Sequence, residues 1–238
     1  MKIFAAIVAL LIVAACAATM SYFYGWWMPN NPLGQYPVKG IDVSHHNGAI
    51  DWRAVASDGV AFTYIKASEG ENFQDDHFVT NFRDATAAGI ACGAYHYFRL
   101  GTPGLAQARN FERTVPHDAL PLPPAVDLET WGNSSTRPSP AEFQAQLADF
   151  LNELRKEYGT EPMIYASSDF IHAYLGNVQP KRLWYRAVVV TPHLDGYDNW
   201  TFWQFTERSQ VKGISGFVDM DVFRGAKEDL LTLRTQAP

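Results

Sequence analysis

Cysteine is almost missing from this chain. Its 238 residues include two cysteines, Cys16 in an apolar N-terminal stretch and Cys92 in an expected strand. We predict no disulfide, because these two segments are not expected to meet, and we interpret Cys92 as a small buried apolar residue. A hydrophobic content of 47%, with aromatic residues at 14%, supports a large core and argues against disorder.

Basic residues are also few. Lys and Arg number 19 against 25 Asp and Glu, the net charge is −6, and no basic run occurs. This balance argues against a nucleic-acid-binding surface. No glycine-rich phosphate-binding turn follows the first expected strand, which disfavours the alternative of an open, doubly wound sheet. We expect a monomer with no cofactor and no bound metal.

Charge is absent from the stretch 3–20, which leads into an aromatic cluster at 22–27. An uncharged stretch of about 18 residues is long enough to span a bilayer, and aromatic residues suit the membrane interface. Two alternatives stay open: small residues at 15–17 permit signal-peptide cleavage, and 13–16 is similar to a bacterial lipobox. All three export the remainder to the bacterial cell envelope, either anchored in the membrane or secreted. We divide the chain into this segment (1–27), a Pro/Gly/Asn linker (28–38) and one domain (39–238).

Strands and helices alternate along the domain. The expected strands are 38–43, 60–67, 90–98, 122–128, 162–166, 183–189, 200–205 and 217–222, and the expected helices are 51–57, 75–88, 102–115, 139–158 and 168–175. Such alternation predicts a parallel sheet with right-handed crossovers. About eight strands in about 200 residues favour an irregular (β/α) barrel. Its helices should be fewer or shortened, since the last connections are too short for full helices.

In a barrel of this kind the reactive residues lie at the carboxyl ends of the strands. Those ends carry acids and aromatics: Asp42, Lys66, Glu69, Tyr95, Tyr97, Asp127, Glu129, Tyr165, Trp203, Gln204, Asp219 and Asp221. Carboxylates that cleave a bond and rings that stack on sugars are typical of a carbohydrate cleft. Asp127 and Glu129 should face one side of their strand, roughly 6.6 Å apart along the chain, while Leu128 packs. Their mutual repulsion should raise one pKa, as an acid/base pair requires.

Five motifs in order, each at an expected strand end, resemble glycoside hydrolase family 25, the Chalaropsis-type muramidases. They are GIDVSHHNG at 40–48, GAYHY at 93–97, VDLE at 126–129, WQF at 203–205 and VD at 218–219. The resemblance covers about 39–223. It implies an irregular β/α barrel that is a lysozyme (N-acetylmuramidase), hydrolysing the β-1,4 bond between N-acetylmuramic acid and N-acetylglucosamine in peptidoglycan.

The resemblance also implies roles for individual residues. Glu129 becomes the general acid/base, and Asp127 supports a nucleophile or a cyclised intermediate. Asp42 and Asp219 become further acids of the cleft. Five residues are expected to bind substrate: Tyr95, Tyr97, Tyr165, Trp203 and Gln204. The expected spacing of the acid pair lies at the lower edge of the range for inverting enzymes and above the range for retention through a covalent enzyme intermediate. Retention can also occur without a close enzymatic nucleophile, if the substrate's own 2-acetamido group attacks. We favour this substrate-assisted mechanism.

The chain departs from the family pattern at two places. Many members have Trp-Ile-Ala where this chain has Trp184-Tyr185-Arg186, and Phe205 replaces a common tyrosine. Arg186 puts a charge near the rim. We interpret Trp184 as a core residue and Asp221 as an ordinary turn acid.

Two other functions stay open. One is a non-catalytic peptidoglycan-binding barrel. The other is a metal-dependent polysaccharide deacetylase or hydrolase built on Asp42, His45 and His46. The second is disfavoured because adjacent histidines on a turn point in different directions.

Overall fold

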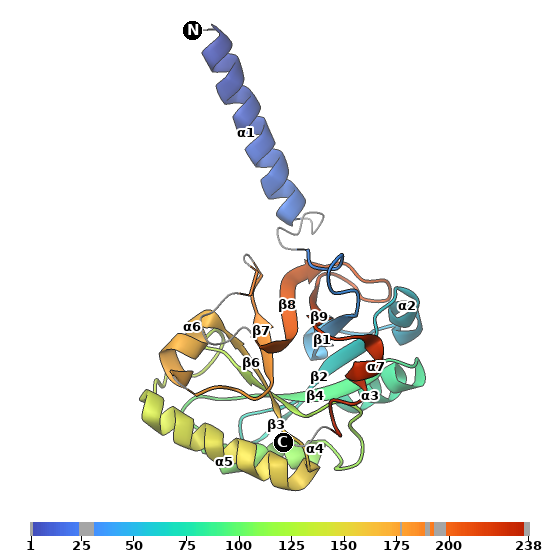
Figure 1. Cartoon of the computed structure of the whole chain (residues 1–238), viewed down its shortest axis with the longest axis vertical. Helices are drawn as coiled ribbons and strands as arrows, with labels where there is room; N and C mark the ends of the chain where they lie inside the picture. The colour runs from blue at the N-terminus through green and yellow to red at the C-terminus, as the bar shows by residue number, and fades with distance from the viewer. Residues whose placement is uncertain (1, 24–30, 177, 189–190, 193–198, 236–238) are drawn as a thin grey trace.

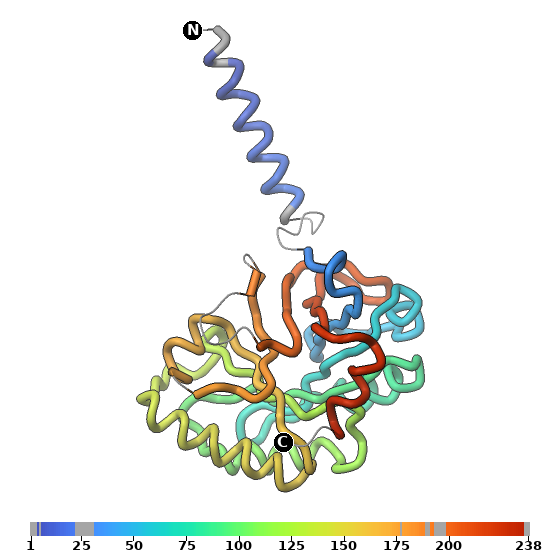
Figure 2. The backbone as a smooth tube through the Cα atoms, viewed as in Figure 1, coloured from blue at the N-terminus to red at the C-terminus, as the bar shows by residue number. Residues whose placement is uncertain are grey.

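Eight strands close into a barrel in the computed structural model, which describes residues 2–23, 31–176, 178–188, 191–192 and 199–235 (Figures 1 and 2). The barrel strands are β1 (Lys39–Val43), β2 (Phe62–Glu69), β4 (Ala91–Tyr97), β5 (Ala125–Leu128), β6 (Met163–Ser167), β7 (Leu183–Arg186), β8 (Trp200–Ser209) and β9 (Val218–Phe223). Their order is β1-β9-β8-β7-β6-β5-β4-β2, and the pairing of β1 with β2 closes the ring. The short strand β3 (Phe73–Gln74) pairs with the end of β2. The expected irregular barrel is confirmed.

The direction of the last strand differs from the expectation. The strands β1, β2 and β4 to β8 pair in parallel, but β9 is antiparallel to both β8 and β1. Only eight residues separate β8 from β9, whereas a parallel crossover needs about a dozen or more. A short connection therefore produces a hairpin, and the start of β9 lies at the rim where the parallel strands end.

The helices from α2 to α6 follow the expected positions with shorter ends, whereas α7 was not expected. They are α2 (Trp52–Ser57), α3 (Phe78–Ala87), α4 (Gly104–Thr114), α5 (Pro140–Tyr158), α6 (Ser168–Phe170) with the π-turn η2 (Ile171–Leu175), and α7 (Lys227–Leu230). The helix α5 begins with a capping box between Ser139 and Glu142 and ends at Gly159, whose φ is +63°. A 3-10 turn, η1 (His45–Asn47), follows β1 and was not anticipated.

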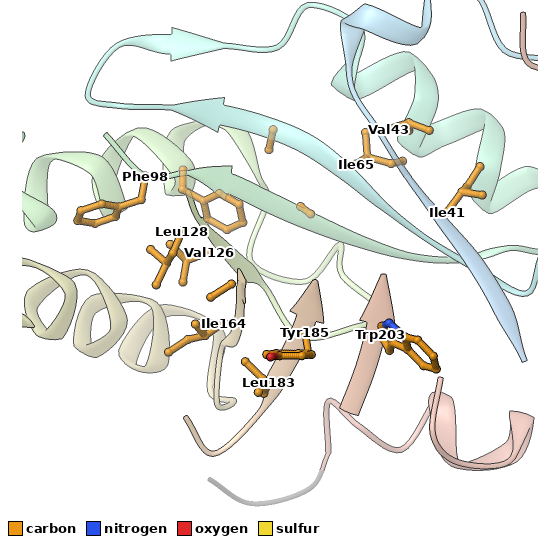
Figure 3. Packing of buried hydrophobic residues seen from close by; sticks show 14 of the residues in the cluster. Ile41, Val43, Ile65, Phe98, Val126, Leu128, Ile164, Leu183, Tyr185 and Trp203 are labelled. Atoms are coloured by element: carbon orange, nitrogen blue, oxygen red, sulfur yellow. The ribbon is translucent and has the colours of Figure 1, made fainter. Parts of the chain in front are cut away.

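Apolar side chains lie on both faces of the barrel wall. An outer core packs between strands and helices and includes Ile41, Val126, Leu128 and Trp203, as Figure 3 shows. An inner core fills the barrel with rings, among them Phe62, Tyr64, Tyr165, Trp184 and Phe202. Leu128 is 1% exposed in the outer core, so the predicted alternation around it is confirmed.

Gly93 on β4 permits this filling of the barrel. A Cβ at this position would lie 2.3 Å from Cε1 of the Tyr64 ring. We expect Gly93→Ala to lower the free energy of unfolding by about 3 kcal/mol, because the buried ring must shift. Thermal or urea unfolding measures this effect. Gly34→Ala is the matched control, since no heavy atom lies within 4 Å of its added Cβ. Equal stability of the two variants would contradict the packing argument.

The N-terminal segment forms helix α1 (Lys2–Phe23). Among the described residues, no helix combines the length and the apolar character that crossing a membrane requires. The membrane anchor expected for this segment is not shown by the described residues, and the aromatic positions 24–27 lie outside them. The division of the chain at 27 and 38 stays a prediction.

Candidate active site

A cleft of about 840 Å³ opens at the rim where the parallel strands end. Eight of the nine predicted site residues line it: Asp42, Tyr95, Tyr97, Asp127, Glu129, Tyr165, Gln204 and Asp219. Asp219 reaches the cleft because β9 runs in the reverse direction, which places the start of that strand beside the end of β1. In register, Asp219 is the direct partner of Asp42. The four acids named from the sequence are therefore brought together.

Trp203 is the exception. It is 2% exposed, belongs to the outer core and donates its indole N–H to the Ala187 carbonyl at 2.9 Å. Successive residues of a strand face opposite sides, so Trp203 and Gln204 cannot both line one cleft. Gln204 takes the inner face, and on the neighbouring strand Trp184 lines the cleft in place of Trp203. Trp184 is nevertheless 2% exposed and belongs to the inner core, as expected, so only the placement of Trp203 differs from the expectation.

A chain of hydrogen bonds joins the acids across the cleft floor. The Tyr165 hydroxyl lies 3.3 Å from Glu129 Oε1 and 2.9 Å from Gln204 Oε1, and it donates its single proton to one of them at a time. The Gln204 amide then donates to Asp42 Oδ2 at 2.8 Å. Tyr165 is thus the residue that links the Glu129 carboxyl group, at the end of β5, to this chain of hydrogen bonds.

Burial raises the pKa of Glu129 above its ordinary value. Arg186, the hydrogen bond from Tyr165 and Lys66 act in the opposite direction, whereas Glu207 raises it further. The pKa of Asp127 is raised well above the usual range, first by burial and then by the charge of Glu129. Because two buried carboxylates repel each other, ionisation of one member of the pair makes ionisation of the other less favourable.

A second carboxyl pair lies beside the first. Asp221 is fully buried, accepts a hydrogen bond from the Trp184 indole at 2.7 Å, and has its pKa raised to about 8, mainly by burial. Asp42 contacts it, and burial together with the charge of Asp221 raises the pKa of Asp42 well above the usual range. Asp221 therefore lies buried on β9 in contact with Asp42, and it is not the ordinary turn acid expected from the sequence.

The histidines that follow β1 order a loop. Nδ1 of His45 lies 2.7 Å from Oδ2 of the buried Asp75, and the His45 ring contacts the His46 ring at a tilt of 42°, with centroids 4.0 Å apart. Within the described part of the chain, no group of three or more His, Cys, Asp or Glu is arranged to hold a metal ion. His96 is fully buried between Ser68 and Gln107 and lies outside the cleft.

The cleft also contains residues that the sequence reasoning missed. Trp131, Arg99 and Glu207 all line it. Trp131 is two residues beyond Glu129, in the loop that follows β5. Residues that follow a strand end lie at the rim of the barrel, so this position could have indicated Trp131 from the sequence. Arg99 forms an ion pair with Glu69, which also pairs with Lys66 at 2.6 Å. Glu207 forms an ion pair with Arg186.

Comparison with known proteins gives a consistent set of relatives. The sequence profile of "Glycosyl hydrolases family 25" matches residues 41–214. The chain is 36% identical over 202 residues to an uncharacterized protein of Escherichia coli O157:H7, covering 82% of this chain and 72% of that one. It is 34% identical over 219 residues to "Lysozyme M1" of Streptomyces globisporus, covering 85% and 73%. A solved family 25 glycosyl hydrolase from Bacillus anthracis superposes with a TM-score of 0.78 at 33% identity, covering 83% and 94%.

Proposed function

The chain belongs to family 25 of the glycosyl hydrolases, and from this membership we infer that it is a lysozyme that hydrolyses peptidoglycan. The bond cleaved is the β-1,4 linkage between N-acetylmuramic acid and N-acetylglucosamine. The observation that carries this function is the placement of Asp127 and Glu129 on one face at the end of β5, in a cleft with Asp42 and Asp219. Release of new reducing ends from purified peptidoglycan by the full chain tests it.

For the mechanism we propose substrate-assisted retention. Glu129 gives its proton to the glycosidic oxygen, while the carbonyl oxygen of the substrate's 2-acetamido group attacks the anomeric carbon and breaks the bond to the leaving sugar. Water then attacks the same carbon, and the Glu129 carboxylate accepts the proton of that water. Two displacements at one carbon return the original configuration.

Asp127 is suited to hold the acetamido group. Within the described residues its buried Oδ1 has no hydrogen-bond partner, so that oxygen is available to accept the acetamido N–H. This hydrogen bond would orient the acetamido carbonyl oxygen toward the anomeric carbon. The Asp127 carboxylate would also stabilise the positive charge of the cyclised intermediate that the acetamido group forms. Lys66 lowers the pKa of Asp127, although burial and the charge of Glu129 raise it by more. The proposed mechanism requires Asp127 to be ionised and Glu129 to carry the proton when substrate is bound.

A non-catalytic peptidoglycan-binding barrel is not favoured, since the four acids that the chemistry needs all line the cleft. For the place of action, we propose the bacterial cell envelope or the exterior, where the substrate lies. Residues 1–27 would direct export in this proposal. N-terminal sequencing of the protein recovered from cells tests whether the segment is retained or cleaved.

The ion pair of Arg186 and Glu207 should set the alkaline limit of activity. A general acid loses activity as pH rises through its pKa, and Arg186 lowers the pKa of Glu129 whereas Glu207 raises it. Arg186→Gln should therefore move the alkaline limb of the kcat/KM profile to higher pH, and Glu207→Gln should move it to lower pH. The exposed residue Arg83 on α3 supplies the control Arg83→Gln, which should leave the profile in place. Shifts of the same sign in both cleft variants would contradict this account.

A further inference from the structure

Trp131 differs from the other described tryptophans. It is 86% exposed, whereas Trp52, Trp184, Trp200 and Trp203 are all 6% exposed or less. A single exposed apolar residue is common on protein surfaces and by itself indicates nothing. Trp131, however, lines the cleft, in the loop that directly follows Glu129. Its indole is therefore presented to water at the place where substrate must enter.

The loop that carries Trp131 is held firmly by its backbone. The Tyr97 hydroxyl donates to the Trp131 carbonyl at 2.6 Å, and Arg99 Nη1 donates to the Gly132 carbonyl at 2.7 Å. The side chain of Asn133 bonds to Phe98, Leu100, Glu129 and Ser134 of the backbone, at 2.8 to 2.9 Å. Because these hydrogen bonds already order the loop backbone, binding of a ligand costs little conformational entropy in the loop.

The charges of the cleft limit what the indole can contact. Seven lining residues are Asp or Glu and three are Lys or Arg, and all three of these cations have carboxylate partners. A neutral ligand surface suits this wall better than an anionic one. The flat apolar face of a pyranose ring matches an indole in shape and polarity, and an aromatic ring provides a large contact area at small entropic cost.

We propose that Trp131 is a stacking platform for the pyranose ring of a neutral N-acetylhexosamine unit of the glycan strand. This proposal rests on the proposed function and adds a binding subsite to it. The platform lies on the β4–β5 side of the cleft, beside Tyr97 and next to the loop residue Gly132. It contributes to binding of the strand, and the proton transfer remains with Glu129.

Binding of the N-acetylglucosamine hexasaccharide to the full chain tests this subsite. The measurements use the Glu129→Gln background, so that the probe stays intact. We expect Trp131→Ala to weaken binding at least tenfold and Trp131→Phe to stay within threefold. Val79→Ala, which removes another exposed apolar side chain outside the cleft, should have no effect. The melting temperature of Trp131→Ala should not change, because the loop is held through backbone groups.

Tryptophan fluorescence supplies an independent readout. The hexasaccharide should shift the emission to shorter wavelength in the Glu129→Gln protein, and Trp131→Phe should bind without that shift. Trp131→Ala could leave the affinity for the hexasaccharide unchanged in the Glu129→Gln background while the otherwise unmodified chain releases reducing ends from peptidoglycan. That result would overturn only the proposal that Trp131 is a stacking platform. Failure of the otherwise unmodified chain to release reducing ends would instead overturn the proposed function.

Discussion

Replacing Glu129 by Gln is expected to lower kcat for peptidoglycan hydrolysis by about 10³-fold. Glutamine keeps the shape of the side chain and the hydrogen bond from Tyr165, but it has no proton of suitable acidity to give the leaving oxygen. The fold should be retained, because the variant removes a charge that burial already disfavours. The measurement is the rate of reducing-end release by the full chain, with the melting temperature measured in parallel.

Asp169→Asn is a matched control for this experiment. Asp169 also lines the cleft, but it lies at the start of α6 and has no part in the proposed chemistry. The control should keep its rate within about threefold, as expected for a surface substitution away from the reacting groups. Equal losses in Glu129→Gln and Asp169→Asn would indicate a general effect of cleft charge and would remove Glu129 from its role as acid.

Replacing Asp127 by Asn is expected to lower kcat by about 100-fold. The amide would no longer provide the negative charge that stabilises the cyclised intermediate, although its oxygen still accepts a hydrogen bond. Proton NMR of the first product formed tests the mechanism in the otherwise unmodified protein. Retention predicts the β anomer, and a thiazoline analogue of the cyclised intermediate should inhibit. An α product would contradict substrate assistance and would make Asp127 the base of an inverting reaction.

The site on β5 could be predicted from local sequence because a strand has a period of two. Asp127 and Glu129 flank Leu128, so one apolar residue that packs outward places both acids inward. The same rule excludes a shared face for Trp203 and Gln204, which were both expected to bind substrate, but it does not decide which of them turns inward. That choice depends on the hydrogen bonds of Gln204 to Tyr165 and Asp42, which come from distant strands.

The direction of β9 and the burial of its residue Asp221 could not be predicted from the sequence. Asp219 reaches the cleft in an antiparallel strand, which pattern reasoning had counted among the parallel ones. Asp221 was interpreted as a turn residue because the family resemblance falls on Asp219, and a buried acid is costly unless partners surround it. Its partners, Trp184 and Asp42, lie 37 and 179 positions away in the chain, so no local window contains them. Such contacts follow from closure of the barrel.

Mass spectrometry of purified peptidoglycan digested with the full chain tests the central claim most directly. After reduction with borohydride, the account predicts soluble muropeptides whose reduced end is N-acetylmuramitol, and the Glu129→Gln protein should release almost none. Products that carry reduced N-acetylglucosamine, or glycan that is deacetylated but uncleaved, would contradict the assignment of the bond and of the reaction.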